Sequence, residues 1–527
     1  MDGIAMTEAE RVKALAFGQG SAAVPQVVVV GAGPAGLTAA ITLAERGATV
    51  TVLEKDVRPG GIARTESYKG YLFDIGGHRF FTKEPEVNAL WQRWLGSEFL
   101  RRPRQSRIFY DGKFFHYPLR AFNALFGLGL WQSVQILASY VRVRLRPSPV
   151  EDTFEQWVSN RFGRRLYEIF FKTYTEKVWG IPCSEIRAEW AAQRIKGLSL
   201  PSAIRNALLP PKGEVIKTLI EAFDYPRRGP GQMWERVVTL VREAGQRVDF
   251  ETDVVSLRHR DGRVVEVVAS SHGAETVWPA TDVISSMPLQ ELVLKLDPPP
   301  PGAIVAAARR LAYRDFLTVV LILDRETLFT DNWIYVHSSG VQVGRIQNFK
   351  NWSPEMVPDA RTTSLGLEYF CQEGDALWTT ADADLIALGA RELEAIGLAR
   401  ADEVRDGAVV RQPKAYPIYD AEYGACLETI KAWLAGLSNL QTIGRNGLHK
   451  YNNQDHSMLT ALRAVENIAG ARHDLWTINT ERSYHEEVRV PDERADDDAG
   501  PVDILDATAS PSQSTASSSP SARTPRR

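Results

Sequence analysis

The chain of 527 residues has little cysteine, little net charge and no long apolar run. Its three cysteines, Cys183, Cys371 and Cys426, are widely spaced and odd in number. This pattern excludes a disulfide framework and shows no metal-ligand spacing, so we expect no metal site and a reducing, cytoplasmic location. A formal net charge of −3 argues against nucleic acid as the main partner.

No stretch of about 18 uninterrupted apolar residues occurs, so the sequence predicts no transmembrane helix. The nearest approach is AFNALFGLGLWQSVQILASYVRVRLR at 121–146, which ends in arginines. An internal amphipathic helix is the main interpretation of this segment. A helix on a membrane surface is the alternative, and it leaves peripheral membrane contact open.

Both ends of the chain are expected to lie outside the folded part. Residues 1–24 are mixed in charge and lack the apolar core of a signal peptide, so we expect a flexible N-terminus. Residues 491–527 are rich in Asp, Ser and Pro, which predicts a disordered tail without chemistry. Over the whole chain, 44 % of the residues are hydrophobic, so a sizeable core can form. The length suffices for two or three domains, or for one large domain with insertions.

Residues 25–56 read PQVVVVGAGPAGLTAAITLAERGATVTVLEKD, the pattern of a strand, a glycine turn, a helix and a second strand. The apolar run 26–30 predicts a buried parallel strand. Gly31, Gly33 and Gly36 then form GxGxxG, in which the glycines permit a tight turn, close approach of a pyrophosphate and close helix–strand packing. The amides at the helix N-terminus would face that phosphate.

Glu54 ends the second predicted strand, at the position where a carboxylate accepts hydrogen bonds from ribose hydroxyls. GxGxxG alone is weak evidence, but here the strand, helix, second strand and acidic terminus are all in place. The sequence therefore predicts a dinucleotide site rather than an ordinary βαβ unit with chance glycines.

Two following segments favour FAD over NAD. RPGGIARTES at 58–67, with Gly60, Gly61 and Arg64, resembles the second signature of the FAD-containing amine oxidase superfamily. The resemblance implies that these glycines approach the cofactor and that Arg64 reaches its phosphates. YLFDIGGHRFF at 71–81 continues it, which implies that Gly77 and His78 lie near the flavin ring; a core or turn role for His78 is the alternative.

Several later segments narrow the resemblance to the UDP-galactopyranose mutase family, over about residues 26–470. A looser likeness extends to protoporphyrinogen oxidases and other amine-oxidase-like flavoproteins. The most specific segment is GRNGLHKYNNQDHSMLTALRAVENI, in which a glycine turn and a tyrosine precede NQDHS at the start of a helix. The other segments are 174–195, 223–235, 283–289, 332–354 and 416–419.

The resemblance assigns roles to the late polar run. It implies that Arg445 contacts cofactor or substrate phosphates and that Tyr451 and Asn453 face the substrate diphosphate. Gln454 and Asp455 would shape the flavin edge and cap the helix. For Asp455 and Ser457, a purely structural role as helix caps is equally open.

A diphosphate sugar requires fixed cations and hydroxyl donors. The resemblance nominates Arg194 and Arg345 as the cations and Tyr335, Tyr416 and Tyr451 as the donors. The alternative for each arginine is a surface charge.

Three positions depart from the family pattern, and all of them concern the substrate. Trp352 replaces a tyrosine, so one phosphate contact is expected to be missing. Arg120 stands where many mutases read uracil with a glutamine, and Ile220 stands where eukaryotic members have an asparagine near the sugar. The sugar and the base therefore stay open, and a thymidine or guanosine diphosphate sugar is as reasonable as UDP-galactose.

The expected fold is α/β with α+β insertions. A Rossmann-like FAD-binding domain would combine 25–82, 205–290 and 435–475, with a mostly helical domain at 83–204 and an antiparallel sheet domain at 291–434 that binds substrate. Oligomeric state stays open.

The resemblance implies an isomerase that interconverts pyranose and furanose sugars through an adduct between reduced flavin and the sugar. NAD(P)H or another reductant would supply the electrons. One alternative is an FAD-dependent oxidoreductase of the amine oxidase, protoporphyrinogen oxidase or desaturase type. A minor alternative is a flavin-binding regulator without turnover.

Overall fold

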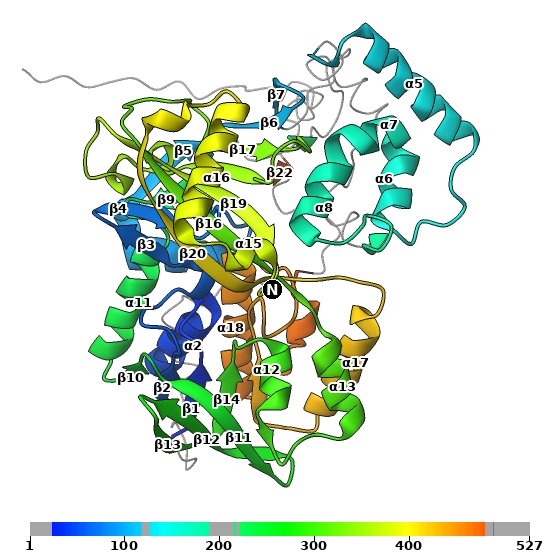
Figure 1. Ribbon diagram of the computed structural model, residues 1–527. Helices are drawn as coiled ribbons and strands as arrows, with labels where there is room; N and C mark the ends of the chain where they lie inside the picture. Colours follow the sequence, from blue (N-terminus) through cyan, green and yellow to red (C-terminus); the bar gives the residue numbers. More distant parts are fainter. Residues whose placement is uncertain (1–23, 118–126, 189–215, 218–221, 480–487, 490–527) are drawn as a thin grey trace, which may run out of the picture.

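The computed structural model describes residues 24–117, 127–188, 216–217, 222–479 and 488–489. A five-stranded parallel sheet, a four-stranded sheet, a seven-stranded sheet and a group of helices make up most of this part (Figure 1). The fold is mixed α/β, as the sequence predicts.

The parallel sheet is the framework of the glycine-rich segment. Its strands, in spatial order, are β10 (Arg247–Asp249), β2 (Thr49–Leu53), β1 (Gln26–Val30), β14 (Asp282–Ser285) and β21 (Leu440–Thr442). All four pairings are parallel. The predicted buried strand at 26–30 is confirmed.

Alternate residues of β1 face opposite sides of the parallel sheet, because side chains in a strand alternate. Val27 and Val29 pack in a core with α2 (Pro34–Glu45), α11 (Gly231–Glu243), α18 (Gln454–Ile468) and α3 (Pro85–Leu95). Helices α2 and α18 lie side by side on this face (Figure 1).

Val28 and Val30 face a second core on the other side of the parallel sheet. That core contains α12 (Leu289–Leu294), α13 (Gly302–Arg310) and α17 (Tyr423–Leu434). It also contains residues of the four-stranded sheet, whose strands are β13 (Ala274–Pro279), β12 (Arg263–Ser271), β11 (Asp253–Arg260) and β15 (Leu296–Asp297).

The seven-stranded sheet forms the other main layer. In spatial order its strands are β20 (Val404–Pro417), β16 (Tyr313–Leu323), β19 (Thr363–Cys371), β18 (Arg345–Asn348), β17 (Trp333–Val336), β6 (Ser106–Tyr110) and β7 (Lys113–His116). All neighbours are antiparallel except β17 and β6. Helix α16 (Asp382–Ala395) covers one face of this sheet.

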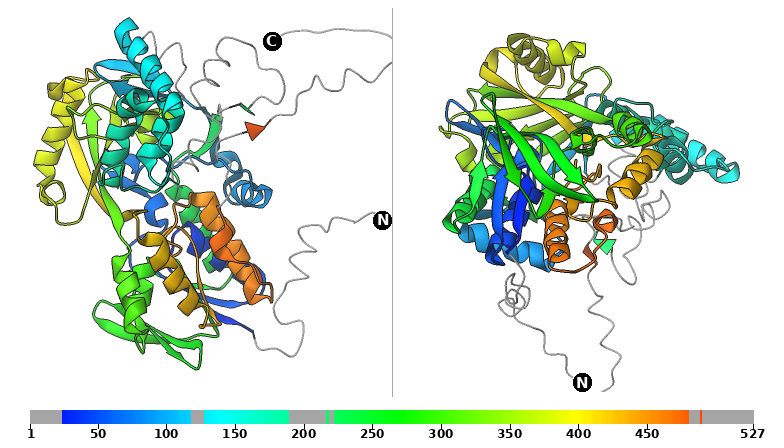
Figure 2. Two further views of the ribbon diagram at one scale, coloured as in Figure 1. Left: turned by 90° about the vertical axis from the view of Figure 1, so that its right-hand side faces the viewer. Right: turned by 90° about the horizontal axis from the view of Figure 1, so that it is seen from below.

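A group of helices stands beside the seven-stranded sheet (Figures 1 and 2). It consists of α5 (Leu130–Leu145), α6 (Phe154–Phe162), α7 (Arg164–Tyr167) and α8 (Thr173–Trp179), with a π-helical turn between the last two. No helix among the described residues is both long and apolar enough to cross a membrane.

Short elements complete the described chain. They are β3 (Thr65–Tyr68), β4 (Tyr71–Asp74), β5 (Phe99–Pro103), β8 (Ile216–Lys217), β9 (Ala222–Pro226), β22 (Val488–Arg489), α14 (Phe349–Trp352) and α15 (Ala376–Thr379).

The segment 83–204, expected to be mostly helical, also supplies strands. Its β6 and β7 extend the seven-stranded sheet, and its β5 pairs with β9. The segment 291–434 likewise supplies α13 and α17 to the core beneath the parallel sheet. The predicted domain boundaries stay a prediction. Most of the N-terminal stretch 1–24 and the tail 491–527 lie outside the described residues.

Candidate functional site

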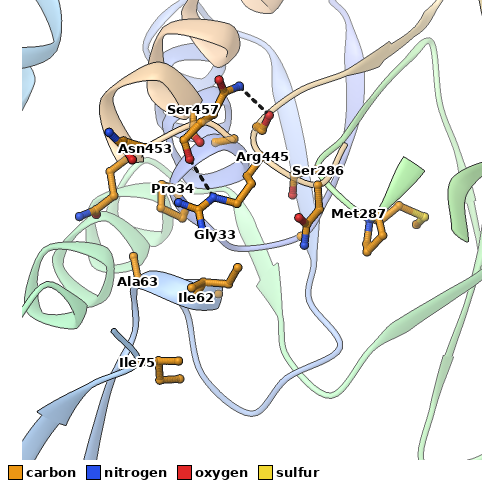
Figure 3. Close-up of a pocket in the computed structure, with 18 of the residues that line it drawn as sticks. Gly33, Pro34, Ile62, Ala63, Ile75, Ser286, Met287, Arg445, Asn453 and Ser457 are labelled. Atoms are coloured by element: carbon orange, nitrogen blue, oxygen red, sulfur yellow. Dashed lines mark hydrogen bonds between the residues drawn. The ribbon is translucent and has the colours of Figure 1, made fainter. Parts of the chain in front are cut away.

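A cavity of about 280 Å³ is lined by residues from both main sheets (Figure 3). The parallel sheet contributes the glycine turn after β1, and the seven-stranded sheet contributes Phe316, Arg345 and Tyr416. Figure 3 shows Arg445 and Asn453 on the side of the cavity opposite Ile62 and Ile75. One cavity therefore joins the two regions that the sequence singles out, at the carboxyl end of parallel strands.

The three glycines of GxGxxG have three different environments. A Cβ on Gly36 would lie 1.8 Å from the carbonyl oxygen of Gly31, so glycine here allows α2 to approach β1 closely. Gly31 has a φ of +97°, and its Cβ would lie 2.3 Å from Oγ of Ser286. Gly33 has no atom within 4 Å of the corresponding position, so its backbone is open to the cavity at the N-terminus of α2.

The second glycine pair packs against this turn. The Gly60 amide donates a hydrogen bond to the carbonyl of Ala32. A Cβ on Gly61 would lie 3.5 Å from Cα of Gly33, and Gly61 lines the cavity. The two glycine segments therefore form one surface, which a phosphate can approach without meeting a side chain.

Arg64 lies outside the lining of the cavity. Its Nε donates to Glu66 at 2.6 Å, and its Nη1 donates to the carbonyl of Gly61 at 2.9 Å and to Gln412 at 3.0 Å. The guanidinium thus stabilises the glycine segment by hydrogen bonding to it, without lining the cavity. A direct contact of Arg64 with cofactor phosphates stays a prediction.

Glu54 follows β2 and lines the cavity. Its carboxylate accepts hydrogen bonds from the amide of Ala32 at 2.5 Å and from the amide of Asp56 at 2.8 Å. Burial raises the pKa of the Glu54 carboxyl, although these two amide hydrogen bonds act in the opposite direction. The carboxylate is positioned at the strand end where the fingerprint requires a ribose acceptor.

His78 lines the cavity, as do Arg345 and Arg445. Loss of solvation lowers its pKa to about 3, and the charges of Arg445 and Arg345 add to the effect. Its Nδ1 has no hydrogen-bond partner. The imidazole is therefore neutral at neutral pH and has a free nitrogen with which to bind a ligand. Beside it, Gly77 must be small, because a Cβ there would lie 3.0 Å from Nε2 of Gln347.

The polar run at 451–458 forms the start of α18 at the cavity. Asn453 occupies the N-cap position, and its backbone amide donates a hydrogen bond to Nδ1 of His456 at 3.4 Å. Gln454, Asp455 and Ser457 all line the cavity. The N-terminal amides of a long helix create positive potential there, which favours a reduced, anionic ring or a phosphate.

In the side-chain amide of Gln454 the oxygen is hydrogen-bonded and the nitrogen is not. Its Oε1 accepts a hydrogen bond from Nε1 of Trp234 at 3.1 Å, whereas the buried Nε2 has no partner. The buried Oδ1 of Asn446, also in the cavity wall, has no partner either. A buried polar atom without a partner is costly, so these two atoms are suited to bind a polar ligand.

Arg445 is held at the cavity by backbone acceptors. Its Nε donates to the carbonyl of Asn452 at 2.8 Å, and its Nη1 donates to the carbonyl of Ala415 at 3.1 Å. The guanidinium carbon lies 4.7 Å from the ring centre of Tyr451. The Tyr451 ring in turn stacks on Tyr416, with centroids 5.6 Å apart and planes at 13°. The sequence-predicted Arg445, Tyr416 and Tyr451 are thus brought together.

Arg345 is fixed by a carboxylate on the neighbouring strand. Its Nε and Nη2 both donate to one oxygen of Glu368, at 2.9 and 2.5 Å, while Gln347 donates to the other oxygen. Burial alone would lower the pKa of Arg345, but the charge of Glu368 raises it well above its ordinary value. Arg345 is a permanent cation with a set orientation.

Tyr335 lies next to the site rather than in the cavity lining. Its ring meets that of Tyr174 edge to face at 5.4 Å and packs against Tyr117 at 5.0 Å. Burial raises the pKa of Tyr174 and of Tyr416 above the ordinary value. These hydroxyls therefore stay protonated and able to donate. A substrate contact of Tyr335 stays a prediction.

Trp352 lies in the core rather than in the cavity lining, which is compatible with the expected loss of a phosphate contact at this position. The indole is buried against Phe223, Tyr225 and Trp333. Its Nε1 donates to the carbonyl of Asn332 at 2.9 Å. Trp352 is thus a core residue behind Gly77.

Three predicted substrate positions, Arg194, Arg120 and Ile220, lie outside the described residues. Sequence reasoning missed Glu368, Gln347 and Ser286. A signal for Glu368 exists, because a lone carboxylate inside the otherwise apolar run TSLGLEYFC needs a buried cation as partner. No group of three metal-ligating side chains occurs among the described residues.

The residues present fit a dinucleotide that carries a flavin. The open backbone at Gly33 suits a pyrophosphate, Glu54 suits a ribose, and the buried unpartnered atoms of Gln454 and His78 suit a polar ring. Beyond them the two arginines and two tyrosines suit an anionic second ligand.

Comparison with known proteins agrees with this geometry. Residues 34–424 match the model of the flavin-containing amine oxidoreductases. A putrescine oxidase of Kocuria rosea is 44 % identical over 84 residues, which cover 16 % of this chain and 17 % of that protein. A protein of Klebsiella pneumoniae named probable UDP-galactopyranose mutase is 29 % identical over 168 residues, covering 31 % of this chain and 43 % of that protein.

The aligned stretches thus span less than half the length of these two curated relatives. Among solved structures, that of a reduced UDP-galactopyranose mutase superposes with a TM-score of 0.75. That superposition covers 88 % of this chain and 100 % of the other, at 21 % identity. At this identity the likeness concerns the fold.

Proposed function

The chain belongs to the flavin-containing amine oxidoreductases, and we propose that within this family it is an FAD-dependent nucleotide-sugar mutase of the UDP-galactopyranose mutase type. The observation that carries the proposal is the pair of fixed guanidinium groups, Arg345 and Arg445, in the same cavity as the glycine turn. Two cations beside a dinucleotide site indicate a second ligand with more than one negative charge.

The glycine turn and the start of α18 would hold the cofactor. Gly33 and Gly61 leave room for its pyrophosphate, and Glu54 would bind the ribose. The unpartnered Nε2 of Gln454 and the first turn of α18 would face the flavin ring, where positive potential favours the reduced form.

A reduced flavin would supply an electron pair to the anomeric carbon as the bond to the diphosphate breaks, and would take it back when the diphosphate returns, so that no net oxidation occurs. The chain's own residues then have to orient the sugar and retain the diphosphate while it is detached. Arg345 and Arg445 would bind the diphosphate, and the stacked Tyr416 and Tyr451 would donate hydroxyl hydrogen bonds to it.

Rigidity of these donors supports such a role. Glu368 accepts two hydrogen bonds from Arg345, and main-chain carbonyls accept those of Arg445, so neither guanidinium has to be ordered when substrate binds. His78, neutral because burial and two arginines lower its pKa to about 3, would donate or accept a hydrogen bond without adding charge.

A second candidate function is oxidation of an amine, which the match to a putrescine oxidase favours. A cationic amine would have to bind beside Arg345 and Arg445, and their charge opposes this. The described part of the cavity therefore supports a nucleotide sugar better than a polyamine.

The proposal is tested by titrating the flavin-loaded protein with UDP, TDP and GDP, and separately with putrescine, while the flavin absorbance spectrum is recorded. The proposal predicts that one of the nucleotides perturbs the spectrum at saturable, micromolar to millimolar concentrations, whereas putrescine neither perturbs nor bleaches it. Bleaching by putrescine without a nucleotide response would favour the oxidase.

A further inference from the structure

One face of α5 is uncovered and apolar. Of the eleven exposed large apolar side chains among the described residues, six lie in this helix. They are Leu130 (84 % exposed), Trp131 (72 %), Val134 (56 %), Leu137 (42 %), Val141 (55 %) and Leu145 (78 %). A cluster of this size on a protein surface indicates a binding surface rather than scattered exposure.

The spacing of these side chains places them on one stripe of the helix. Steps of three and four residues connect Leu130, Val134, Leu137, Val141 and Leu145, so all five share a face of an α-helix. Ile136, the only buried residue of α5, lies on the opposite face and packs into the core of the helical group. The apolar stripe therefore points away from the protein.

The position of α5 in the molecule makes the stripe accessible. Figures 1 and 2 show α5 at the outer edge of the helical group, where it stands clear of both main sheets. Among the described elements, α5 packs mainly against α6 and α7. The stripe residues on its outward face are exposed.

The charges of α5 have one sign. The helix contains no aspartate or glutamate, and Arg142, Arg144 and Arg146 follow one another at its C-terminal end. At helical spacing, Arg142 and Arg144 flank the apolar stripe on its two sides. No ion pair is present for these three exposed arginines among the described residues.

Unlike the three arginines at the end of α5, arginines in the neighbouring helices form ion pairs. Arg161 pairs with Glu151 at 2.8 Å, and Arg164 pairs with Glu155 at 3.0 Å. The helical group thus neutralises its other arginines internally. The three at the end of α5 are left for an anionic partner outside the chain.

We propose that α5 docks the protein onto an anionic phospholipid surface. The apolar stripe would enter the boundary between headgroups and acyl chains, with the helix parallel to the membrane. Arg142 and Arg144 would extend from the edges of the stripe to the lipid phosphates, as long basic side chains do at interfaces. Trp131 would lie at the headgroup level, where indole rings are favoured.

Two other arrangements fit the stripe less well. A second copy of the chain joined by a two-fold contact would bring α5 against α5, which adds arginines and no carboxylate. A spanning helix would need about 20 apolar residues, whereas α5 has 16 residues and charged ones at its end. The proposal concerns a surface away from the cavity and does not depend on the reaction.

The test is flotation of the full-length, flavin-loaded protein with two kinds of vesicle. One kind is pure phosphatidylcholine, and in the other roughly one third of the lipid is phosphatidylglycerol. The proposal predicts that the protein floats with the anionic vesicles, that it stays behind with the neutral ones, and that raised salt weakens the binding.

Matched variants assign the binding to α5. Val134→Glu with Leu137→Glu places two carboxylates in the stripe and is expected to reduce the floated fraction at least about tenfold. Val57→Glu with Val277→Glu adds the same charge at exposed valines elsewhere, 59 % and 44 % exposed, and should leave flotation unchanged. Replacing Arg142, Arg144 and Arg146 with glutamine should remove the preference for anionic lipid.

Three results would overturn the proposal. The first is wild-type protein that floats with neither vesicle, and the second is flotation that persists in the Val134→Glu/Leu137→Glu variant. The third is a lipid-free dimer in sedimentation velocity that this variant abolishes, since the stripe would then be a contact between copies. Circular dichroism and an unchanged Tm of each variant verify that the protein still folds.

Discussion

Arg345 and Glu368 are direct cross-strand partners in the antiparallel pair of β18 and β19. The carboxylate is fully buried, and one of its oxygens accepts both hydrogen bonds from the guanidinium. The strand register therefore places a fixed cation at the cavity. We expect both the stability of the sheet and the binding of an anion to depend on this pair.

Removing only the cation should destabilise the protein. Arg345→Gln leaves Glu368 as an uncompensated buried charge, which costs about 3–5 kcal/mol. In the double variant Arg345→Gln/Glu368→Gln that charge is gone, so most of the stability should return. Both variants should lose nucleotide binding at least about tenfold, measured by titration of the flavin spectrum, with stability measured by urea unfolding.

A matched pair in the same sheet provides the control. Arg107 on β6 contacts the buried Asp331 at 2.6 Å, and neither residue lines the cavity. Arg107→Gln/Asp331→Asn should leave nucleotide binding unchanged. Full nucleotide affinity in the Arg345→Gln/Glu368→Gln variant would contradict the assigned role of Arg345.

Two substitutions in the glycine turn distinguish an effect on folding from an effect on cofactor binding. Gly36→Ala drives a methyl group into the carbonyl of Gly31, so we expect a lower Tm even without flavin. Gly33→Ala meets no protein atom, so its Tm without flavin should equal that of the parent while its flavin affinity falls at least about tenfold. Thermal unfolding with and without added FAD distinguishes the two.

Equal flavin affinity in Gly33→Ala and the parent would show that the pyrophosphate does not lie at this turn. Apo protein of both variants, prepared in parallel, is the reference for each melting curve.

Buried histidines predict a pH dependence of stability. His337 is 5 % exposed and stacks on Tyr174, and burial lowers its pKa to about 3 from an ordinary 6.5. Between these values the unfolded chain binds a proton that the folded one does not. The free energy of unfolding should therefore fall with decreasing pH, by up to about 1.4 kcal/mol per pH unit for each such histidine.

His337→Gln should reduce that slope between pH 6 and 4, whatever it does to stability at neutral pH. Urea unfolding at a series of pH values measures it. A slope identical to that of the parent would mean that His337 is protonated to the same extent in both states.

A substitution of Trp352 tests whether this side chain lies in the core or reaches the nucleotide. Trp352→Tyr restores the residue expected from the resemblance, yet it should not improve nucleotide binding, because the side chain lies in the core. It should lower stability by about 1–3 kcal/mol through the lost volume and the lost hydrogen bond to Asn332. A clear gain in nucleotide affinity would contradict the position of this side chain.

The local features of the fold could be predicted from the sequence, because adjacent residues encode them. The valine run before Gly31 predicts β1, and the polar run before Met458 predicts the start of α18. Both depend on side-chain alternation and capping, which act within a few residues. The expected caps were wrong, because Asn453 is the N-cap and Gln454, Asp455 and Ser457 lie within the helix.

Features that depend on distant pairing could not be predicted. Nothing near β6 in the sequence indicates that it pairs with β17, more than 200 residues later, and the surrounding helical pattern concealed it. The apolar run around Glu368 indicates a buried charge, but its pairing with Arg345 depends on the register of β18 against β19. The burial of Trp352 could not be predicted either, because burial is a property of the whole core.

Product analysis with the flavin reduced tests the mutase reaction itself. The protein is reduced with dithionite under anaerobic conditions, incubated with UDP-galactopyranose and, in parallel, with thymidine and guanosine diphosphate sugars, and the products are separated by chromatography. The account predicts conversion of one pyranose to its furanose form by reduced protein and none by oxidised protein. Absence of any furanose with every sugar, together with reduction of the oxidised flavin by an amine and its rapid reoxidation by oxygen, would contradict this.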